Sequence, residues 1–151
     1  MKAKNPKINA GLTELIEKAA DFHGHLGPFL VIGVRMGNTA ERILNTNAMQ
    51  LKKLEATVKI PLLTPFSCVL DGIQVTTHCT VGNQKLRIEN SQKEIAACFE
   101  LQNSDRTLKV SVNPKIVEEL MNEISKGSSN EELAQKIASM PENQLFTIGK
   151  Q

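Results

Sequence analysis

The chain has no tryptophan and no tyrosine, and its 151 residues include only five phenylalanines. A core of this composition must be mainly aliphatic, and the chain is long enough to form one as a single domain over residues 1–151. The scarcity of aromatic side chains argues against stacking on the bases of single-stranded nucleic acid. The net charge of +2 is small and scattered along the chain, so we expect no nucleic-acid partner.

Long apolar runs and paired cysteines are missing as well. No apolar run approaches the length of a membrane span, and the basic N-terminus leads into an amphipathic segment without a signal-peptide hydrophobic region. We therefore expect a cytoplasmic protein with no membrane partner. Cys68, Cys79 and Cys98 form no CxxC pair, which argues against a disulfide framework or a zinc ribbon. Cys98 is expected to be a buried thiol on a strand. The pattern around Cys68 is ambiguous, and we favour a buried core position for it.

The apolar periodicity predicts an α+β fold, in which N-terminal helices pack on a mostly antiparallel sheet and further helices follow. After a loose arm at residues 1–10, the predicted helices cover residues 11–22, 28–44, 115–126 and 131–140. The predicted strands cover residues 55–61, 85–90, 94–102 and 107–112. Residues 66–79 fit a strand or a helix. We favour a helix, because it places Asp71, Gln74 and His78 on one stripe.

Two polar clusters interrupt the apolar pattern. The first is His23-Gly24-His25, in a predicted turn where glycine permits a left-handed backbone and Pro28 suits the first turn of the next helix. The second covers residues 71–83. A packed core has little use for two imidazoles separated by a glycine, whereas a metal site or a polar pocket has an obvious use for them. We expect the fold to bring the two clusters together.

The residues of both clusters also carry a resemblance to a known family. The run Phe22-His23-Gly24-His25 with Pro28, the helical Gly33-Val34-Arg35-Met36-Gly37, and the later Asp71-Gly72-Ile73-Gln74 and Cys79-Thr80-Val81-Gly82-Asn83 resemble the signatures of the E subunit of formylmethanofuran dehydrogenase. The resemblance implies an α+β core with a metal-capable pocket, often an intertwined homodimer. It also implies an accessory role to a molybdenum or tungsten enzyme complex, in one-carbon metabolism such as methanogenesis.

Two departures from the family pattern affect the expected site. Many relatives carry a C-terminal zinc ribbon, but this chain has no cysteine after Cys98, so only the core domain is expected. The family commonly reads HGHxCPG, and here Gly27 stands where that cysteine would be. His78 stands where the family usually has a glycine, so the site either uses fewer thiolates or recruits His78.

The donor set suits zinc or another divalent transition metal, because such ions bind neutral imidazole and thiolate. We expect His23, His25 and Cys79 to be the metal ligands. Gln74 and His78 are expected to bind the cofactor, with Gln74 orienting a ligand or a bound water and His78 as a further candidate ligand.

Catalytic roles are expected for Asp71 and Cys79, if the protein is an enzyme. Asp71 would be a general base towards a metal-bound water or an orienting partner of an imidazole, and Cys79 would be a thiolate nucleophile. Arg35 lies within an apolar helix, where it would pair with Asp71 or Glu41 or occupy an exposed face.

Three functions fit these residues. The first is a metal-binding protein, with zinc as the expected metal, that serves a molybdenum or tungsten enzyme. The second is a free-standing enzyme that uses a metal or a thiolate on a small molecule. The third is a non-catalytic dimeric interaction module, in which both clusters only stabilise the seam between two copies.

Overall fold

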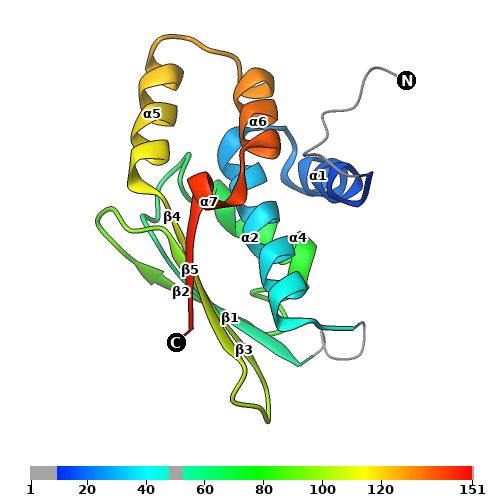
Figure 1. Cartoon of the computed structure of the whole chain (residues 1–151). Coiled ribbons are helices and arrows are strands. Elements are labelled where there is room, and N and C mark those ends of the chain that lie inside the picture. Colours follow the sequence, from blue (N-terminus) through cyan, green and yellow to red (C-terminus); the bar gives the residue numbers. More distant parts are fainter. Residues whose placement is uncertain (1–9, 48–52, 151) are drawn as a thin grey trace.

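The computed structural model describes residues 10–47 and 53–150 and confirms the α+β fold. The helices are α1 (Ala10–His23), α2 (Pro28–Leu44), α4 (Cys68–Thr77), α5 (Pro114–Ser125), α6 (Asn130–Ser139) and α7 (Glu142–Leu145) (Figure 1). The strands are β1 (Leu54–Ile60), β2 (Leu86–Asn90), β3 (Ala96–Leu101), β4 (Thr107–Val112) and β5 (Phe146–Gly149). The predicted N-terminal arm lies outside the described residues, except that its last residue begins α1.

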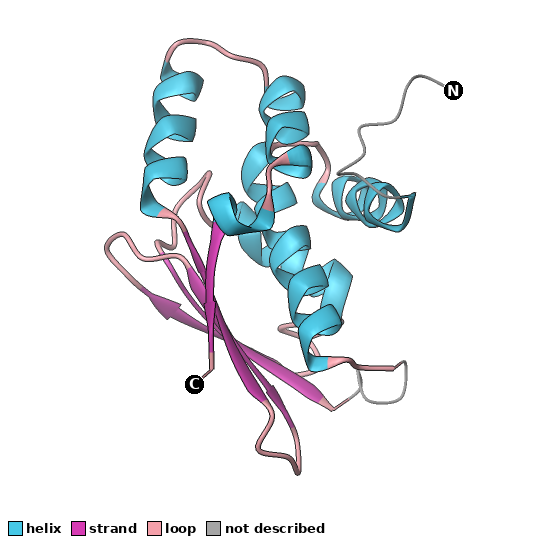
Figure 2. Cartoon of the chain, in the orientation of Figure 1, coloured by secondary structure: helices cyan, strands magenta, loops and turns pink. Residues whose placement is uncertain are grey.

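The five strands form one sheet in the order β2-β1-β3-β4-β5. The β1–β2 pair is parallel and the other three pairs are antiparallel, so the sheet is mostly antiparallel, as predicted. Strand β1 alternates between buried Leu54, Ala56, Val58 and Ile60 and the more exposed residues between them. The helices cover one face of the sheet (Figure 2). The other face carries mainly polar side chains, among them Thr57, Lys59 and Glu100.

The apolar periodicity of the sequence did not predict the elements at the C-terminal end of the chain. All the predicted helices and strands occur with small shifts of their ends, and residues 66–79 contain the helix α4. Helix α7 and strand β5 were not predicted. Strand β5 has four residues, too few for a clear alternation, and it is held by antiparallel pairing with β4, with Ile148 opposite Val110 and Phe146 opposite Val112.

Helices α2 and α4 cross at a point where each helix has a glycine, which carries no side chain. A Cβ atom on Gly33 would lie 2.0 Å from the carbonyl oxygen of Val69, and a Cβ on Gly72 would lie 2.3 Å from the carbonyl oxygen of Leu30. Both distances are shorter than van der Waals contact, so this approach requires glycine in both helices. The crossing brings the turn of α4 that carries Asp71 close to the start of α2.

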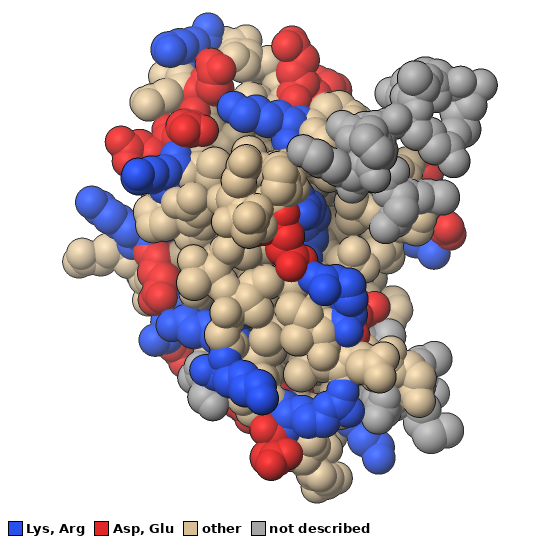
Figure 3. All heavy atoms as spheres, viewed as in Figure 1, with Lys and Arg blue, Asp and Glu red and all other residues tan. Residues whose placement is uncertain are grey.

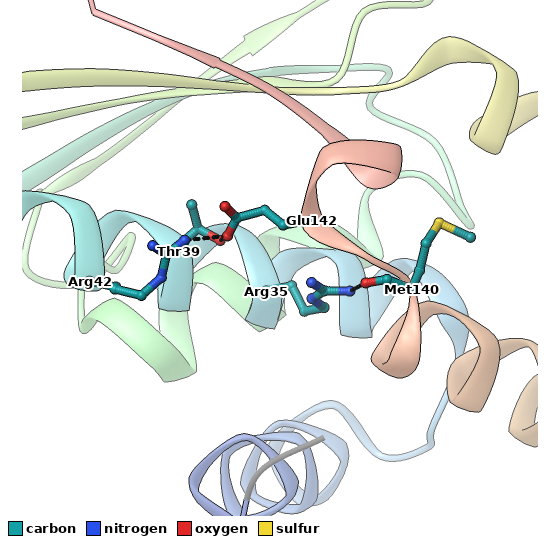
Figure 4. A network of polar contacts seen from close by, with 5 residues as sticks. All are labelled: Arg35, Thr39, Arg42, Met140 and Glu142. Atoms are coloured by element: carbon teal, nitrogen blue, oxygen red, sulfur yellow. Dashed lines mark hydrogen bonds and ion pairs between the residues drawn. The ribbon is translucent and has the colours of Figure 1, made fainter. Parts of the chain in front are cut away.

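A polar network, which we call the C-terminal clamp, ties α2 to the segment from α6 to α7 (Figure 4). Its members are Arg35, Thr39, Arg42, Ile137, Met140 and Glu142. Arg35 donates from Nη1 to the carbonyl oxygens of Ile137, at 2.9 Å, and of Met140. The carboxylate of Glu142 accepts hydrogen bonds from Thr39, at 2.9 Å, and from Arg42.

The clamp corrects the expectation for Arg35, which pairs with neither Asp71 nor Glu41. Its guanidinium satisfies two carbonyl groups at the end of α6, where a helix leaves its last acceptors without partners. Burial lowers the pKa of the Arg35 guanidinium, and the charge of Glu142 acts in the opposite direction. This arginine is therefore a structural link between segments about 100 residues apart in the sequence.

Neither sign of charge dominates the face of the molecule that Figure 3 shows. On the face shown in Figure 3, basic and acidic side chains are interspersed over the sheet and the helices. None of the described helices is both long enough and apolar enough to cross a membrane.

Candidate functional site

The first polar cluster lies in the turn between α1 and α2, as predicted. Gly24 has a φ of +103°, and its N–H donates to the carbonyl oxygen of Ala20 at 2.8 Å, which ends α1. This left-handed backbone is the conformation for which glycine is preferred. The ring centroids of His23 and His25 lie 4.6 Å apart, so the turn places both imidazoles at one spot.

A line of hydrogen bonds joins this turn to α4, and we call His23, Asp71 and Gln74 the pocket chain. Nδ1 of His23 lies 2.5 Å from Oδ2 of Asp71, and Nε2 of Gln74 donates to the other carboxylate oxygen at 3.2 Å. The Oε1 atom of Gln74 in turn accepts from the backbone N–H of Val81 at 3.1 Å. These hydrogen bonds join the two polar clusters, as we expected from the sequence.

The far side of the His23 ring has no partner among the described residues. Nε2 of His23 is buried and makes no hydrogen bond to them, and the side chain as a whole is only 14% exposed. Because an ionised carboxylate can only accept, Asp71 holds the proton on Nδ1 of the ring. In the neutral imidazole this leaves the Nε2 lone pair free, which is how a carboxylate orients a histidine for a metal or for a proton transfer.

His23 also lines a small pocket of about 30 Å³. Its polar walls are His23, His25, Cys68 and Asn130. Its apolar walls include Pro28, Phe29, Pro65 and Ile124. A volume of this size has room for one or two water molecules. Helix α4, the α1–α2 turn and the α5–α6 region all contribute, so the pocket forms only when three distant segments meet.

Cys68 is the thiol of this pocket, and it also packs against the main hydrophobic core, as expected. It is half-buried at the start of α4, three residues before Asp71 and therefore on the same side of the helix. Burial, and next the charge of Asp71, raise the pKa of the Cys68 thiol, while a backbone hydrogen bond acts in the opposite direction. The i, i+3 spacing to Asp71 was the signal in the sequence that could have identified it.

Cys79 and His78 lie elsewhere. The Cys79 thiol is fully buried, donates to the carbonyl oxygen of Leu54 at 3.2 Å, and does not line the pocket. Burial raises its pKa above the ordinary value for a thiol. His78 ends α4 with a φ of +62°, and its side chain is exposed. The left-handed backbone there explains why a glycine would suit this position.

Two further residues lie at or near the pocket, the predicted Gln74 and the unpredicted Asn130. Gln74 supports Asp71 rather than facing the pocket, and Asn130, at the start of α6, was not predicted at all. Within residues 10–47 and 53–150, no three His, Cys, Asp or Glu side chains are already arranged to hold a metal ion. The arrangement offers an oriented imidazole, a second imidazole and a protonated thiol around one small space.

Part of the chain is similar in sequence to a curated protein. A "Probable S-adenosyl-L-methionine-binding protein" of Archaeoglobus fulgidus is 36% identical over 75 residues, which are 50% of this chain and 20% of that protein. The chain therefore spans about one fifth of the length of this relative.

The fold is shared with a tungsten formylmethanofuran dehydrogenase FmdE-like protein from Syntrophus aciditrophicus. The TM-score is 0.63 at 20% sequence identity, and the match covers 93% of this chain and 71% of that one. A family model described as "FmdE, Molybdenum formylmethanofuran dehydrogenase operon" matches residues 22–147. The chain belongs to the FmdE family.

Proposed function

We propose that this protein binds a divalent transition metal, zinc in the first instance, in the pocket at the start of α2. The observation that carries the proposal is the buried Nε2 of His23, which has no partner among the described residues while Nδ1 is held by Asp71. A buried nitrogen without a hydrogen bond costs free energy, and a metal ligand bond would offset that cost.

His23, His25 and Cys68 would hold the metal. His25 is exposed and Cys68 is half-buried, so both side chains have room to turn towards Nε2 of His23. Two imidazoles and one thiolate form a donor set that zinc accepts. In this proposal Cys68 takes the role that we expected of Cys79, because the Cys79 thiol is committed to the backbone of β1.

The protonated Cys68 thiol has a measurable consequence. Since its pKa is raised, the metal must displace a proton to bind the sulfur. Zinc binding should therefore release a proton and tighten as the pH rises towards the pKa of the thiol.

The test is a metal analysis with matched cysteine variants. Protein purified without chelators is analysed for bound elements, and the metal-free form is titrated with zinc and with cobalt(II), whose thiolate bond gives an ultraviolet charge-transfer band. We expect one equivalent of metal and a band that disappears in Cys68→Ser. Cys98→Ser is the control, because Cys98 is a half-buried thiol on the outer face of β3.

The affinity data decide the proposal. We expect Cys68→Ser and His23→Ala each to weaken binding by roughly tenfold or more, with Cys98→Ser unchanged. A wild-type protein that takes up no metal, or equal effects of the Cys68 and Cys98 variants, would reject it.

The physiological role that we propose follows from the family. Its description names a molybdenum formylmethanofuran dehydrogenase operon, so we infer an accessory role beside a molybdenum or tungsten enzyme of one-carbon metabolism, with the protein acting as a homodimer. Sedimentation analysis of the purified protein tests the dimer. Co-purification of the tagged protein from its native host, with mass spectrometry of the bound chains, tests the enzyme partner.

A thiol-dependent enzyme is the second candidate, because Asp71 contacts His23 and Cys68 lines the same pocket as His23. In such an enzyme these residues would be the orienting acid, the base and the nucleophile. The raised pKa of Cys68 argues against it, since the thiolate is the reactive form. Alkylation of the metal-free protein by iodoacetamide separates the two candidates. A Cys68 that reacts faster than Cys98, and loses this advantage in His23→Ala, would favour the enzyme.

A further inference from the structure

Strand β2 forms one edge of the sheet, and among the described strands it pairs only with β1. An edge strand presents a row of backbone N–H and C=O groups that can pair with a further strand. Strand β2 is five residues long and carries two exposed side chains of opposite charge, Arg87 and Glu89, on either side of the half-buried Ile88. The arrangement of these three residues points to the partner of the edge.

The parallel pairing with β1 decides which backbone groups of β2 face outward. The carbonyl oxygen of Lys85 and the N–H of Ser91 both bond to β1, at 2.9 and 3.1 Å. Because backbone groups of successive residues point to opposite sides of a strand, those of Ile88 face the free edge. The N–H of Leu86 also points away from β1, and it donates to the carbonyl oxygen of Thr80 at 3.3 Å. The central residue of the edge therefore offers a donor and an acceptor.

The sequence of β2 complements itself in the antiparallel direction. A two-fold axis at Ile88 places this residue opposite its own copy, so that the two N–H groups and the two carbonyl groups form a hydrogen-bonded pair. The same axis places Arg87 opposite Glu89 of the second copy, once on each side of the axis. Opposite charges directly across two strands stabilise their pairing.

The two charges also select this register. Moving the axis to Arg87 or to Glu89 would place like charges opposite each other, and so would parallel pairing of the two copies, which is unfavourable. Charged side chains on an edge strand usually prevent association, but here their symmetry permits one partner. The strand at the other edge, β5, carries no charged residue within Phe146–Gly149 that could set a register in this way.

Exposed apolar side chains lie at both ends of the edge strand. Leu62 is 52% exposed, and its N–H donates to Oδ1 of Asn90 at 3.0 Å, at the end of β2. Val81 is 60% exposed and directly follows the residue that accepts from Leu86, at the start of β2. Antiparallel pairing brings the Leu62 end of one copy beside the Val81 end of the other, where apolar surface would leave water.

We propose that β2 pairs with β2 of a second copy of this chain, antiparallel and centred on Ile88, so that the two sheets become continuous. This inference rests on the homodimer proposed above and adds the surface through which the copies associate. It does not depend on the metal site.

The test exchanges the charges of the edge. Wild type, Arg87→Glu, Glu89→Arg and the double variant are compared by sedimentation equilibrium over a concentration series, and thermal unfolding checks that each is folded. An equimolar mixture of the two single variants is a further sample, because its mixed dimer again pairs opposite charges at both positions. Glu100→Arg is the control, since it changes an exposed charge on the inner strand β3.

We expect the wild type to dimerise and each single variant to dissociate at least about tenfold more readily, because both cross-strand pairs become like-charged. The double variant and the mixture should recover the dimer, and Glu100→Arg should behave as wild type. Folded single variants that dimerise like the wild type, or a double variant as weak as the single ones, overturn the edge pairing and leave the homodimer standing. A wild type that is monomeric at every concentration overturns the homodimer itself, so the two failures are distinguishable.

Discussion

The pocket chain and the C-terminal clamp are both polar networks that join segments far apart in the sequence, and they differ in how they end. In the clamp, the carbonyl groups of Ile137 and Met140 and the carboxylate of Glu142 all receive donors from α2. The pocket chain ends on Nε2 of His23, which has no partner among the described residues. A closed network stabilises a fold, whereas an open end inside a pocket is available for a ligand.

An unpartnered atom is not enough to make a site. Oε1 of Glu41 and Oγ1 of Thr76 are also buried without a hydrogen bond to the described chain, but neither residue lines the pocket of His23. The difference between the two networks therefore lies in the combination of an open end, a cavity and further donors, and it can be tested by breaking each part separately.

The largest expected effect is a loss of stability at the crossing of α2 and α4. Gly72→Ala would place a methyl group 2.3 Å from the carbonyl oxygen of Leu30 and 2.5 Å from the backbone nitrogen of Val34. Because backbone atoms cannot rotate away, we expect the variant to lose about 3 kcal/mol of unfolding free energy or fail to fold. Chemical denaturation measures this loss. Gly82→Ala, whose Cβ would meet nothing closer than 3.9 Å, is the control, and equal stability of the two variants would contradict the close crossing.

Breaking the clamp should reduce stability without affecting the metal. Arg35→Met leaves the carbonyl groups of Ile137 and Met140 without their donor, so we expect a loss of roughly 2 kcal/mol of unfolding free energy. Arg42→Met removes an exposed pair with Glu142 and should cost less than about 1 kcal/mol. Zinc affinity, measured by competition with a chromogenic chelator, should be unchanged in both. A weaker zinc complex in Arg35→Met would show that the two networks are coupled.

Breaking the pocket chain should weaken zinc binding and leave the stability of the metal-free protein almost unchanged. Asp71→Asn removes the charge that holds the His23 proton on Nδ1, and loss of such an orienting partner typically costs about 10- to 100-fold in metal affinity. The same chelator competition measures it, and the unfolding free energy of the metal-free variant should change by less than about 1 kcal/mol. Unchanged zinc affinity would remove Asp71 from the site.

The smallest expected effect is a change in the pH dependence of stability at Glu41. Its Oε1 atom is buried without a hydrogen bond to the described residues and belongs to neither network. Burial raises the pKa of its carboxyl from near 4.5 to about 7, so the folded state binds this proton more tightly than the unfolded chain does. Its contribution to stability is present below the ordinary pKa and is lost as the pH rises towards about 7. Glu41→Gln should flatten this part of the stability–pH curve, measured by thermal unfolding with and without zinc. A slope that changes when zinc binds would connect Glu41 to the pocket.

Periodicity predicted most of the fold, because the helices and the longer strands each bury one regular face. The i, i+3 spacing on α4 also predicted that Asp71 and Gln74 would act together. The predicted helix over residues 66–79 was too long, because the left-handed backbone of His78 ends α4 at Thr77. Cys79 lies beyond this end, and its thiol bonds to the carbonyl oxygen of Leu54. Asn130 could not be found in this way, since it meets the pocket only through the packing of α6, about a hundred residues after His23.

The pocket takes its proposed metal donors from residues 23–68 and part of its wall, Ile124 and Asn130, from the second half of the chain. In the course of evolution these two parts can therefore change at different rates. Substitutions at the α5–α6 wall would alter which molecule fits while the donors stay as they are, and substitutions among the donors would alter the metal within the same enclosure. This division offers protein engineers a starting point, because residues 124–130 can be varied as a small library while metal content reports on the integrity of every variant.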